Sequence, residues 1–153
     1  GVKIGVINLV GRVFMQAVDC PFRTALEEVN SIKDKTNIIF VDMHAEATSE
    51  KIALCWYLDG MVSALCGTHT HVQTADERVF PKGTAFISDL GMTGPFESVI
   101  GRRVDQIIVR FVTQMPTRFE MAENDIRLNG AVIDVDEKTG KARSIIRIEK
   151  KLN

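Results

Sequence analysis

The sequence has few of the features that mark membrane proteins, disulfide-rich secreted proteins and nucleic-acid-binding proteins. No apolar run approaches the roughly 20 residues that cross a bilayer, and the start of the chain lacks the charged and apolar regions of a signal peptide. The three cysteines, Cys20, Cys55 and Cys66, lie far apart without a CxxC pair, which is typical of a reduced protein. Lys+Arg (19) and Asp+Glu (20) nearly cancel, and no basic run indicates a nucleic-acid partner. We therefore expect a cytoplasmic protein with no membrane or specific nucleic-acid partner.

The length and composition favour a single domain over residues 1–153. A chain of 153 residues with 45% hydrophobic side chains can bury a sizeable core, and it contains no repeat or linker that would divide it. The chain starts with Gly1 rather than with methionine, and a strand-like alternation begins at once. We therefore expect that an N-terminal portion is missing and that residues 1–153 are the C-terminal part of a larger domain.

Helical and extended patterns alternate along the chain. Strands are expected at residues 2–9, 37–43, 63–66, 78–80, 84–90, 126–135 and 142–149, and helices at residues 21–33, 48–56 and 104–114. Asp19 is a candidate cap for the first helix, and residues 91–95 are expected to form an irregular loop. The order predicts a layered α/β (α+β) protein whose sheet is parallel first and antiparallel later.

Large apolar side chains outside the strands are assigned to the core. Ile107, Ile108, Phe111 and Val112 have the spacing of an apolar stripe on a helix. Phe14, Met15, Phe111 and Met115 are interpreted as packing residues rather than as part of a cofactor site.

All three histidines lie where predicted strands end. His44 follows the run NIIFVDM, and His69 and His71 follow the strand at residues 63–66 in the segment GTHTHVQ. Open α/β sheets bind ligands beyond the carboxyl ends of their strands, and imidazole is a common ligand of transition metals. If the backbone is extended at Thr70, His69 and His71 point to the same side and can face one pocket. The sequence therefore predicts a metal site at this edge of the sheet.

The alternative is that these polar residues have only local structural roles. His44 could then cap the helix that starts near Thr48, and His69 and His71 could bond loop carbonyls. Asp42 lies two residues before His44 and is a candidate acceptor for an imidazole N–H, although it could equally cap the next segment. An HxH pair alone does not decide between these interpretations.

Four segments resemble one family of enzymes. IFVDMHAEATSEK, GTHTHVQTAD, FPKGTAFISDLGMTGPF and VINLVGRVFM are similar to motifs of the YmdB-type family of calcineurin-like metallophosphoesterases. The resemblance runs over nearly the whole chain, from about residue 2 to residue 148. It implies a layered sandwich of mixed β-sheets flanked by helices, with two divalent metal ions such as Fe, Mn or Zn. It also implies hydrolysis of phosphodiesters, including cyclic nucleotides, by a bacterial protein.

The resemblance also implies roles for individual residues. His44 and His69 match ligands of one ion, and His71 matches a ligand of the other. Thr68, Gln73 and Thr93 are, with Asp42, candidates for orienting the ligands or contacting substrate. Two such ions about 4 Å apart clamp a phosphate and lower the pKa of a bound water.

The sequence departs from the family pattern in one respect. The GD, GEN and GNH motifs, which supply the other metal ligands and the general acid, do not occur in the chain. No residue of the chain can be given the role of general acid. We therefore expect the chain to be the C-terminal part of a metallophosphoesterase from which the N-terminal strands are missing, and to be inactive alone although the full-length protein is an enzyme.

Two other functions and one assembly state stay open. Three imidazoles and one water form a known catalytic zinc site, so the chain could be a complete mononuclear metal hydrolase. It could also be a non-catalytic metal-binding or assembly module. If the N-terminal strands are missing, the sheet edge left without its neighbours would favour a homo-oligomer.

Overall fold

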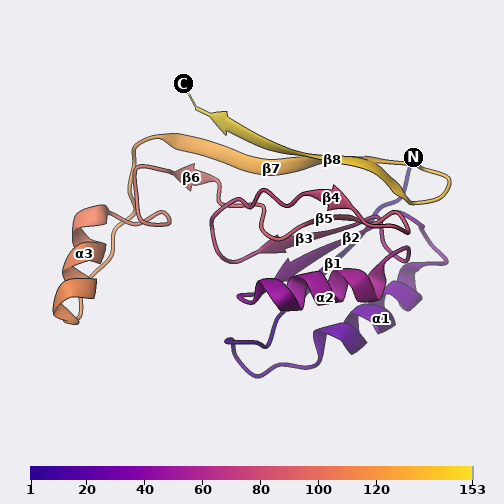
Figure 1. The fold of residues 1–153 in the computed structure, drawn as a ribbon, viewed down its shortest axis with the longest axis horizontal. Helices are drawn as coiled ribbons and strands as arrows, with labels where there is room; N and C mark the ends of the chain where they lie inside the picture. Colours follow the sequence, from indigo (N-terminus) through magenta and orange to yellow (C-terminus); the bar gives the residue numbers. More distant parts are fainter. Residues whose placement is uncertain (153) are drawn as a thin grey trace.

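The structure has three layers: a pair of helices, a central sheet and a second sheet (Figure 1). The computed structural model describes residues 1–152. The elements are β1 (Gly5–Val10), α1 (Pro21–Ile32), β2 (Ile39–His44), α2 (Thr48–Leu58), β3 (Ala64–Thr68), β4 (Arg78–Val79), β5 (Ala85–Ile87), β6 (Gly94–Pro95), α3 (Val104–Thr113), β7 (Ile126–Val135) and β8 (Ala142–Lys151). The mixed α/β class and the change from parallel to antiparallel pairing are confirmed.

The central sheet has the strand order β1-β2-β3-β5-β4. The first four of these strands are parallel, and β4 pairs antiparallel with β5. In β2 alternate side chains face opposite layers, so that Ile39, Val41 and Met43 are buried against the helices. Asp42 and His44 therefore share the opposite face, as their spacing predicts.

The helices α1 and α2 cover one face of the central sheet, and the β7–β8 hairpin covers the other (Figure 1). Val29 and Leu54 come from the helices and pack in the core beneath the sheet. Ala142 and Ile145 come from β8 and pack against Ala85 of the central sheet. The predicted hairpin is confirmed, and its turn is stabilised by the carboxylate of Asp136, which accepts two backbone hydrogen bonds.

Three local predictions were wrong. Cys20, not Asp19, is the N-cap of α1, because Pro21 is the first helical residue and favours an extended conformation for the residue before it. Cys20 makes no side-chain cap bond. The strand at residues 2–9 begins only at Gly5. The loop at residues 91–95 contains the short strand β6, which pairs with β7 in the second sheet.

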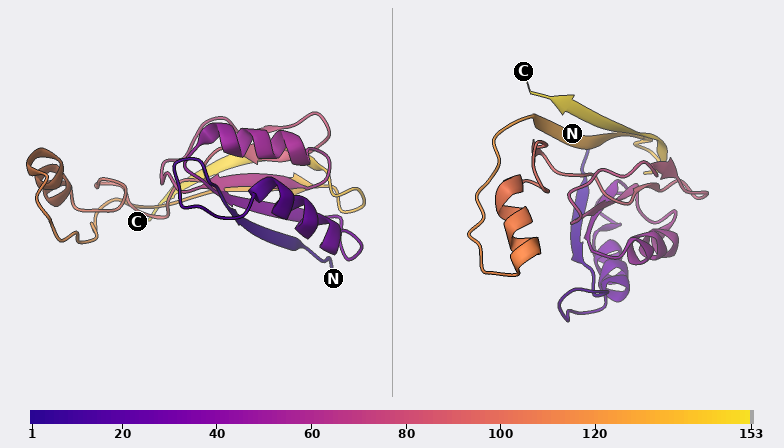
Figure 2. Two further views of the ribbon diagram at one scale, coloured as in Figure 1. Left: turned by 90° about the horizontal axis from the view of Figure 1, so that it is seen from below. Right: turned by 60° about the vertical axis from the view of Figure 1, so that its left-hand side comes forward.

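The helix α3 lies beyond the two sheets rather than on them (Figure 2). Only Ile107 of its apolar stripe is buried, whereas Phe111 and Val112 are 69% and 78% exposed. The assignment of Phe14, Phe111 and Met115 to the core was wrong, while Met15 does pack against it. Helical periodicity reveals an apolar face, but it does not reveal whether the rest of the fold covers that face.

None of the helices in residues 1–152 combines the length and apolarity needed to span a bilayer.

Candidate metal centre

Parallel pairing of β2 with β3 brings the histidine-bearing segments together. His44 is the last residue of β2 and lies in register with Thr68, the last residue of β3. His69 is the next residue of the chain, so two imidazoles meet at the carboxyl edge of the central sheet. This is the edge at which α/β proteins bind their ligands.

A chain of hydrogen bonds fixes the ring of His44. Asn8 Nδ2 donates to Asp42 Oδ2 (2.7 Å), and the Thr68 hydroxyl donates to Asp42 Oδ1 (2.8 Å). The Thr68 oxygen lies 3.1 Å from His44 Nδ1. Because the Thr68 proton is directed at Asp42, its oxygen accepts from His44 Nδ1–H, which leaves the lone pair on His44 Nε2. Asp42 thus orients the imidazole through Thr68 rather than by direct contact.

His69 is held between His44 and Glu46. His69 Nδ1 lies 3.0 Å from His44 Nε2, and the two rings stand at 90° with centroids 4.8 Å apart. On the far side of the ring, His69 Nε2 lies 3.1 Å from Glu46 Oε2. The carboxylate of Glu46 accepts a hydrogen bond from Nε2–H, so Nδ1 is the nitrogen that faces His44.

The two facing nitrogens have the geometry of neighbouring metal ligands. Two nitrogens bound to one metal at about 2.1 Å lie about 3.0 Å apart at a right angle and about 3.4 Å apart at the tetrahedral angle. The 3.0 Å separation of His44 Nε2 and His69 Nδ1 is close to these values. Each ring also has its outer nitrogen held by an acceptor, as is usual for ligating histidines. Within residues 1–152, however, no group of three or more His, Cys, Asp and Glu side chains is placed to hold a metal ion. The pair is therefore suited to supply two donors of a larger ligand set.

His71 does not join this pair. The backbone has positive φ at both His69 (115°) and His71 (67°), so the segment bends instead of running extended through Thr70. His71 Nδ1 lies 3.2 Å from the carbonyl oxygen of Ile100, whereas His69 Nδ1 lies 3.0 Å from His44 Nε2. His71 lines a neighbouring cavity of about 360 Å³ together with Gln73 and Met92.

Gln73 and Thr93, the other two predicted site residues, lie in different environments. The side-chain amide of Gln73 lies within hydrogen-bond distance of the carbonyls of Leu90 (3.2 Å), Gly130 (3.0 Å) and Ile148 (3.2 Å), so it ties the histidine segment to both sheets. Thr93 is exposed in the turn that leads into β6. Gln73 therefore has a structural role and also borders the cavity beside His71, whereas Thr93 lies on the surface.

Asp76 orders the segment that follows His71. Burial opposes ionisation of its carboxyl, but hydrogen bonds from the Ser88 and Thr74 hydroxyls and from the Ser88 amide outweigh burial and lower its pKa. The ionised carboxylate thus bridges this segment to the end of β5. It touches none of the three histidines.

Two carboxylates of the HAEATSE motif have defined roles that the sequence did not reveal, Glu46 at the histidine pair and Glu50 at the segment after β1. Glu46 contacts His69, as described above. Glu50 is buried in the first turn of α2, where it accepts hydrogen bonds from the backbone amides of Arg12 (3.1 Å) and Val13 (3.3 Å). A Cβ atom on Gly11 would lie 2.5 Å from the Glu50 carboxylate, so only glycine permits this approach. The acidic positions after His44 were a visible signal, whereas the contact of Asn8 with Asp42 depends on strand register.

Comparison with known proteins identifies the family. A model described as YmdB-like protein matches residues 1–148. A 2',3'-cyclic-nucleotide 2'-phosphodiesterase of Bacillus subtilis is 53% identical over 148 residues, which are 97% of this chain and 56% of that protein. A hypothetical protein from Thermus thermophilus has a similar crystal structure (TM-score 0.91, 38% identity, 99% of this chain and 58% of that one). So does a novel phosphatase from Mycoplasma pneumoniae (TM-score 0.89, 39% identity, 98% and 54%).

The chain spans about half the length of the curated relatives it matches. The family match covers nearly all of its own length, and the relatives share its sequence as well as its fold. The chain therefore belongs to the YmdB-like protein family.

Proposed function

We propose that this chain forms the C-terminal part of a metal-dependent phosphodiesterase that hydrolyses phosphodiesters such as cyclic nucleotides. The main support for this proposal is the arrangement of His44 and His69, because His44 Nε2 and His69 Nδ1 face each other at a spacing close to that of two metal ligands. The phosphodiesterase and phosphatase names of the relatives support the same reaction class. Residues 1–153 are accordingly one part of a larger catalytic domain.

The ligand roles follow the positions of the three imidazoles. His44 and His69 would hold one divalent ion, and His71 would serve a second one. Fe, Mn and Zn all suit imidazole nitrogen, so the donor set does not select one of them. When bound, a pair of such ions activates a water molecule and stabilises the charge on the phosphate and the leaving oxygen.

The chain's own residues prepare the site for that chemistry. Asp42 and Thr68 keep the lone pair of His44 on Nε2, and Glu46 keeps Nδ1 of His69 available. The cavity beside His71 is open enough to take part of a substrate. No residue of the chain is assigned as the general acid.

The bend at Thr70 argues for two ions rather than one three-histidine ion. His71 Nδ1 is bonded to the Ile100 carbonyl, and His71 is not part of the direct contact between His44 and His69. A mononuclear hydrolase with three imidazoles on one zinc needs all three nitrogens to converge. This arrangement supports the two-metal proposal over the mononuclear alternative and leaves a non-catalytic module as the outcome to be tested.

Hydrolysis assays distinguish these functions. Purified residues 1–153 are assayed with bis(p-nitrophenyl) phosphate and a 2',3'-cyclic nucleotide in the presence of Mn²⁺ or Fe²⁺, and the full-length protein is assayed in parallel. We expect turnover by the full-length protein and little or none by the chain alone. Robust turnover by the chain alone would contradict its assignment as part of a site, and inactivity of both proteins with every metal would contradict the phosphodiesterase assignment.

We also propose that the chain self-associates and resides in the cytoplasm. Among the described residues, β1 pairs with β2 only, and Val6 of β1 is 74% exposed. An open edge with apolar side chains favours pairing with another chain. The three cysteines are free, as expected in a reducing compartment. Light scattering tests the association, and a clean monomer would contradict it.

A further inference from the structure

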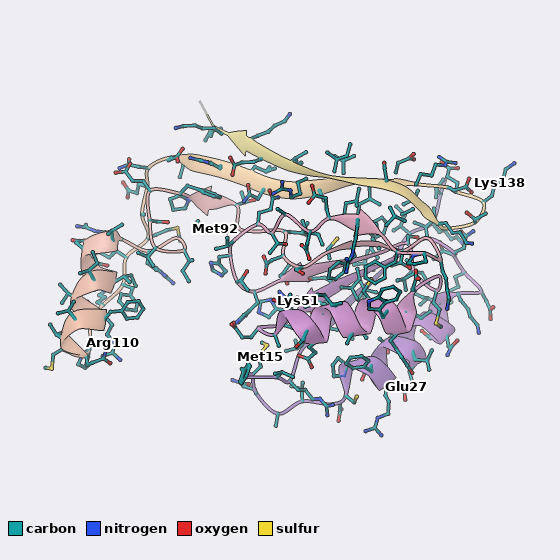
Figure 3. The ribbon with its side chains drawn as sticks, in the orientation of Figure 1. Met15, Glu27, Lys51, Met92, Arg110 and Lys138 are labelled. Carbon is teal, nitrogen blue, oxygen red and sulfur yellow. The ribbon has the colours of Figure 1, made fainter. Side chains whose placement is uncertain are left out.

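A buried ion pair lies directly behind the histidine segment. Lys51 belongs to the first turn of α2, and Asp89 follows β5. Their side chains are 1% and 2% exposed, and Lys51 Nζ lies 3.1 Å from Asp89 Oδ2. Figure 3 labels Lys51 at the start of α2, between that helix and the central sheet. Neither residue touches a histidine through its side chain.

Asp89 holds the backbone on both sides of the cavity beside His71. Its Oδ2 atom also accepts a hydrogen bond from the backbone N–H of Thr70 (2.9 Å), and its Oδ1 atom accepts one from the N–H of Gly91 (2.9 Å). Thr70 is the residue between His69 and His71, both of which have positive φ. Non-glycine residues stay in that conformation only where surrounding contacts hold them there. The carboxylate of Asp89 supplies such a contact at the centre of the bend.

Lys51 reaches Asp89 across Gly67, the residue that precedes Thr68. A Cβ atom at Gly67 would lie 2.8 Å from Lys51 Cδ and 1.7 Å from the carbonyl oxygen of Ser88. Glycine at this position therefore lets the lysine stem pass and lets β3 approach the segment after β5. Helix α2 starts four residues after His44. The pair therefore joins the start of α2 to the segment after β5 and, through the Thr70 amide, to the segment that contains His69 and His71.

Stability alone gives little reason for charges at this place. Removing an ammonium and a carboxylate from water is costly, and well-packed apolar side chains of similar size are often as stable as a buried ion pair. A pair of apolar residues could fill the same space, but it could not accept the N–H groups of Thr70 and Gly91. The charges thus serve to fix the position of the backbone.

We infer that Lys51 and Asp89 are a positioning pair that fixes the backbone bend at Thr70. The bend keeps the His69 ring beside the His44 ring and places His71 at the neighbouring cavity. The inference rests on the proposed function, since it assigns the pair a role toward the same metal centre. Asp89 acts through the Thr70 amide, and Lys51 acts by holding the Asp89 carboxylate in position through the 3.1 Å ion pair.

The double variant Lys51→Met/Asp89→Leu separates positioning from stability. It replaces the ion pair with apolar side chains of similar size, so we expect the urea midpoint to stay close to that of the unaltered chain. The Thr70 amide loses its acceptor, and we expect its hydrogen exchange, followed by NMR without metal, to accelerate by at least about 10-fold. The NOE contacts between the His44 and His69 rings should weaken at the same time. Titration with Zn²⁺ should show affinity lowered by about 10- to 100-fold.

The matched control is Arg143→Met, which removes two ion pairs, with Asp134 and Asp136, on the surface of the β7–β8 hairpin. It should change neither Thr70 exchange nor Zn²⁺ affinity. If the double variant does not fold, Asp89→Asn is followed by the same readouts, because its amide keeps the shape but has a single acceptor oxygen, so the Thr70 and Gly91 N–H groups cannot both be bonded as they are by the carboxylate. A folded variant that retains Thr70 protection and the contact between the rings would overturn the inference. If the unaltered chain binds no Zn²⁺, the proposed metal site fails, whereas the two metal-free readouts still decide the positioning role.

Discussion

His44 Nε2 and His69 Nδ1 face each other at 3.0 Å, although 25 positions separate the two residues in the chain. Parallel pairing of β2 with β3 creates this contact by placing His44 beside Thr68. Acceptors on the outer sides of both rings then determine which nitrogens are free. The positions of the two candidate ligands are thus determined by the edge of the sheet and by the hydrogen bonds around the rings.

Removing either member of the facing pair should affect metal binding more than removing His71. In the full-length protein we expect His44→Ala or His69→Ala to weaken binding of one metal ion strongly, because each variant leaves a single imidazole of the facing pair at the site. His71→Ala should leave that ion bound, since His71 points toward Ile100. Isothermal titration calorimetry of the folded variants measures this difference. Equal losses in all three variants would favour one ion shared by three histidines.

Thr68→Val should weaken the site without removing a ligand. Valine has the shape of threonine but cannot relay the hydrogen bond from His44 Nδ1 to Asp42, so the orientation and tautomer of the ring are no longer fixed. We expect Zn²⁺ affinity to fall by about 10-fold or more. Thr113→Val, in exposed α3, is the matched control. Unchanged affinity of the Thr68 variant would show that the relay has no function.

The cysteines should differ in reactivity. Hydrogen bonding to the backbone of Arg23 is the main cause that lowers the pKa of the Cys20 thiol, whereas burial raises the pKa of Cys66 to about 11 and that of Cys55 still further. Because the thiolate is the nucleophile, iodoacetamide at pH 7.5 should modify Cys20 first. Mass spectrometry of peptides from the folded protein measures the order. Modification of Cys66 before Cys20 would contradict it.

Acid should destabilise the β7–β8 hairpin through two aspartates. Arg127 and Lys151 lower the pKa of Asp125 to about 2, and the Thr139 amide and Arg143 lower that of Asp136 to about 2, both below the usual 3.8. A carboxyl with a depressed folded-state pKa stabilises the fold above its unfolded pKa, and the contribution disappears as the pH falls through the folded value.

The free energy of unfolding should therefore fall between about pH 4 and pH 2. Asp136→Asn removes one of the two contributions, so its stability should depend less steeply on pH in that interval. Urea denaturation at a series of pH values checks this prediction. Parallel curves for the variant and the unaltered chain would contradict it.

The apolar face of α3 should contribute little to stability in this chain. Phe111→Ser removes a side chain that is 69% exposed, so the free energy of unfolding should change by less than about 0.5 kcal/mol. Leu54→Ala creates a cavity in the core and should cost about 2 to 5 kcal/mol. Chemical denaturation compares the two variants. A large loss in the Phe111 variant would show that this face is covered in solution.

Much of the fold could be predicted because its signals are local. An apolar β-branched run predicted β2, a brief core segment predicted β3, Pro21 marked the start of α1, and alternation predicted the β7–β8 hairpin. The positions of Phe14 and Phe111 could not be predicted, because an apolar side chain is buried only where another element covers it. Strand β6 was missed for a similar reason, since its two residues are ordered by pairing with β7.

The candidate site was predictable in its residues but not in its geometry. The three histidines, Asp42 and Thr68 were identified from motifs and strand ends, and their roles toward a metal stay predictions. The bend at Thr70 was not visible, because it depends on the buried carboxylate of Asp89, which lies 19 positions away. Glu46 was passed over because a single acidic residue after a strand has many ordinary explanations.

Crystallography of the chain soaked with Zn²⁺, with anomalous data collected at the zinc edge, shows directly whether His44 and His69 share one metal ion. We expect an anomalous peak within about 2.1 Å of both His44 Nε2 and His69 Nδ1. The hydrogen bonds between Glu46 and His69 Nε2 and between Thr68 and His44 Nδ1 should persist. A bound ion on the opposite ring nitrogens, or full occupancy elsewhere with none between these two rings, would contradict this expectation.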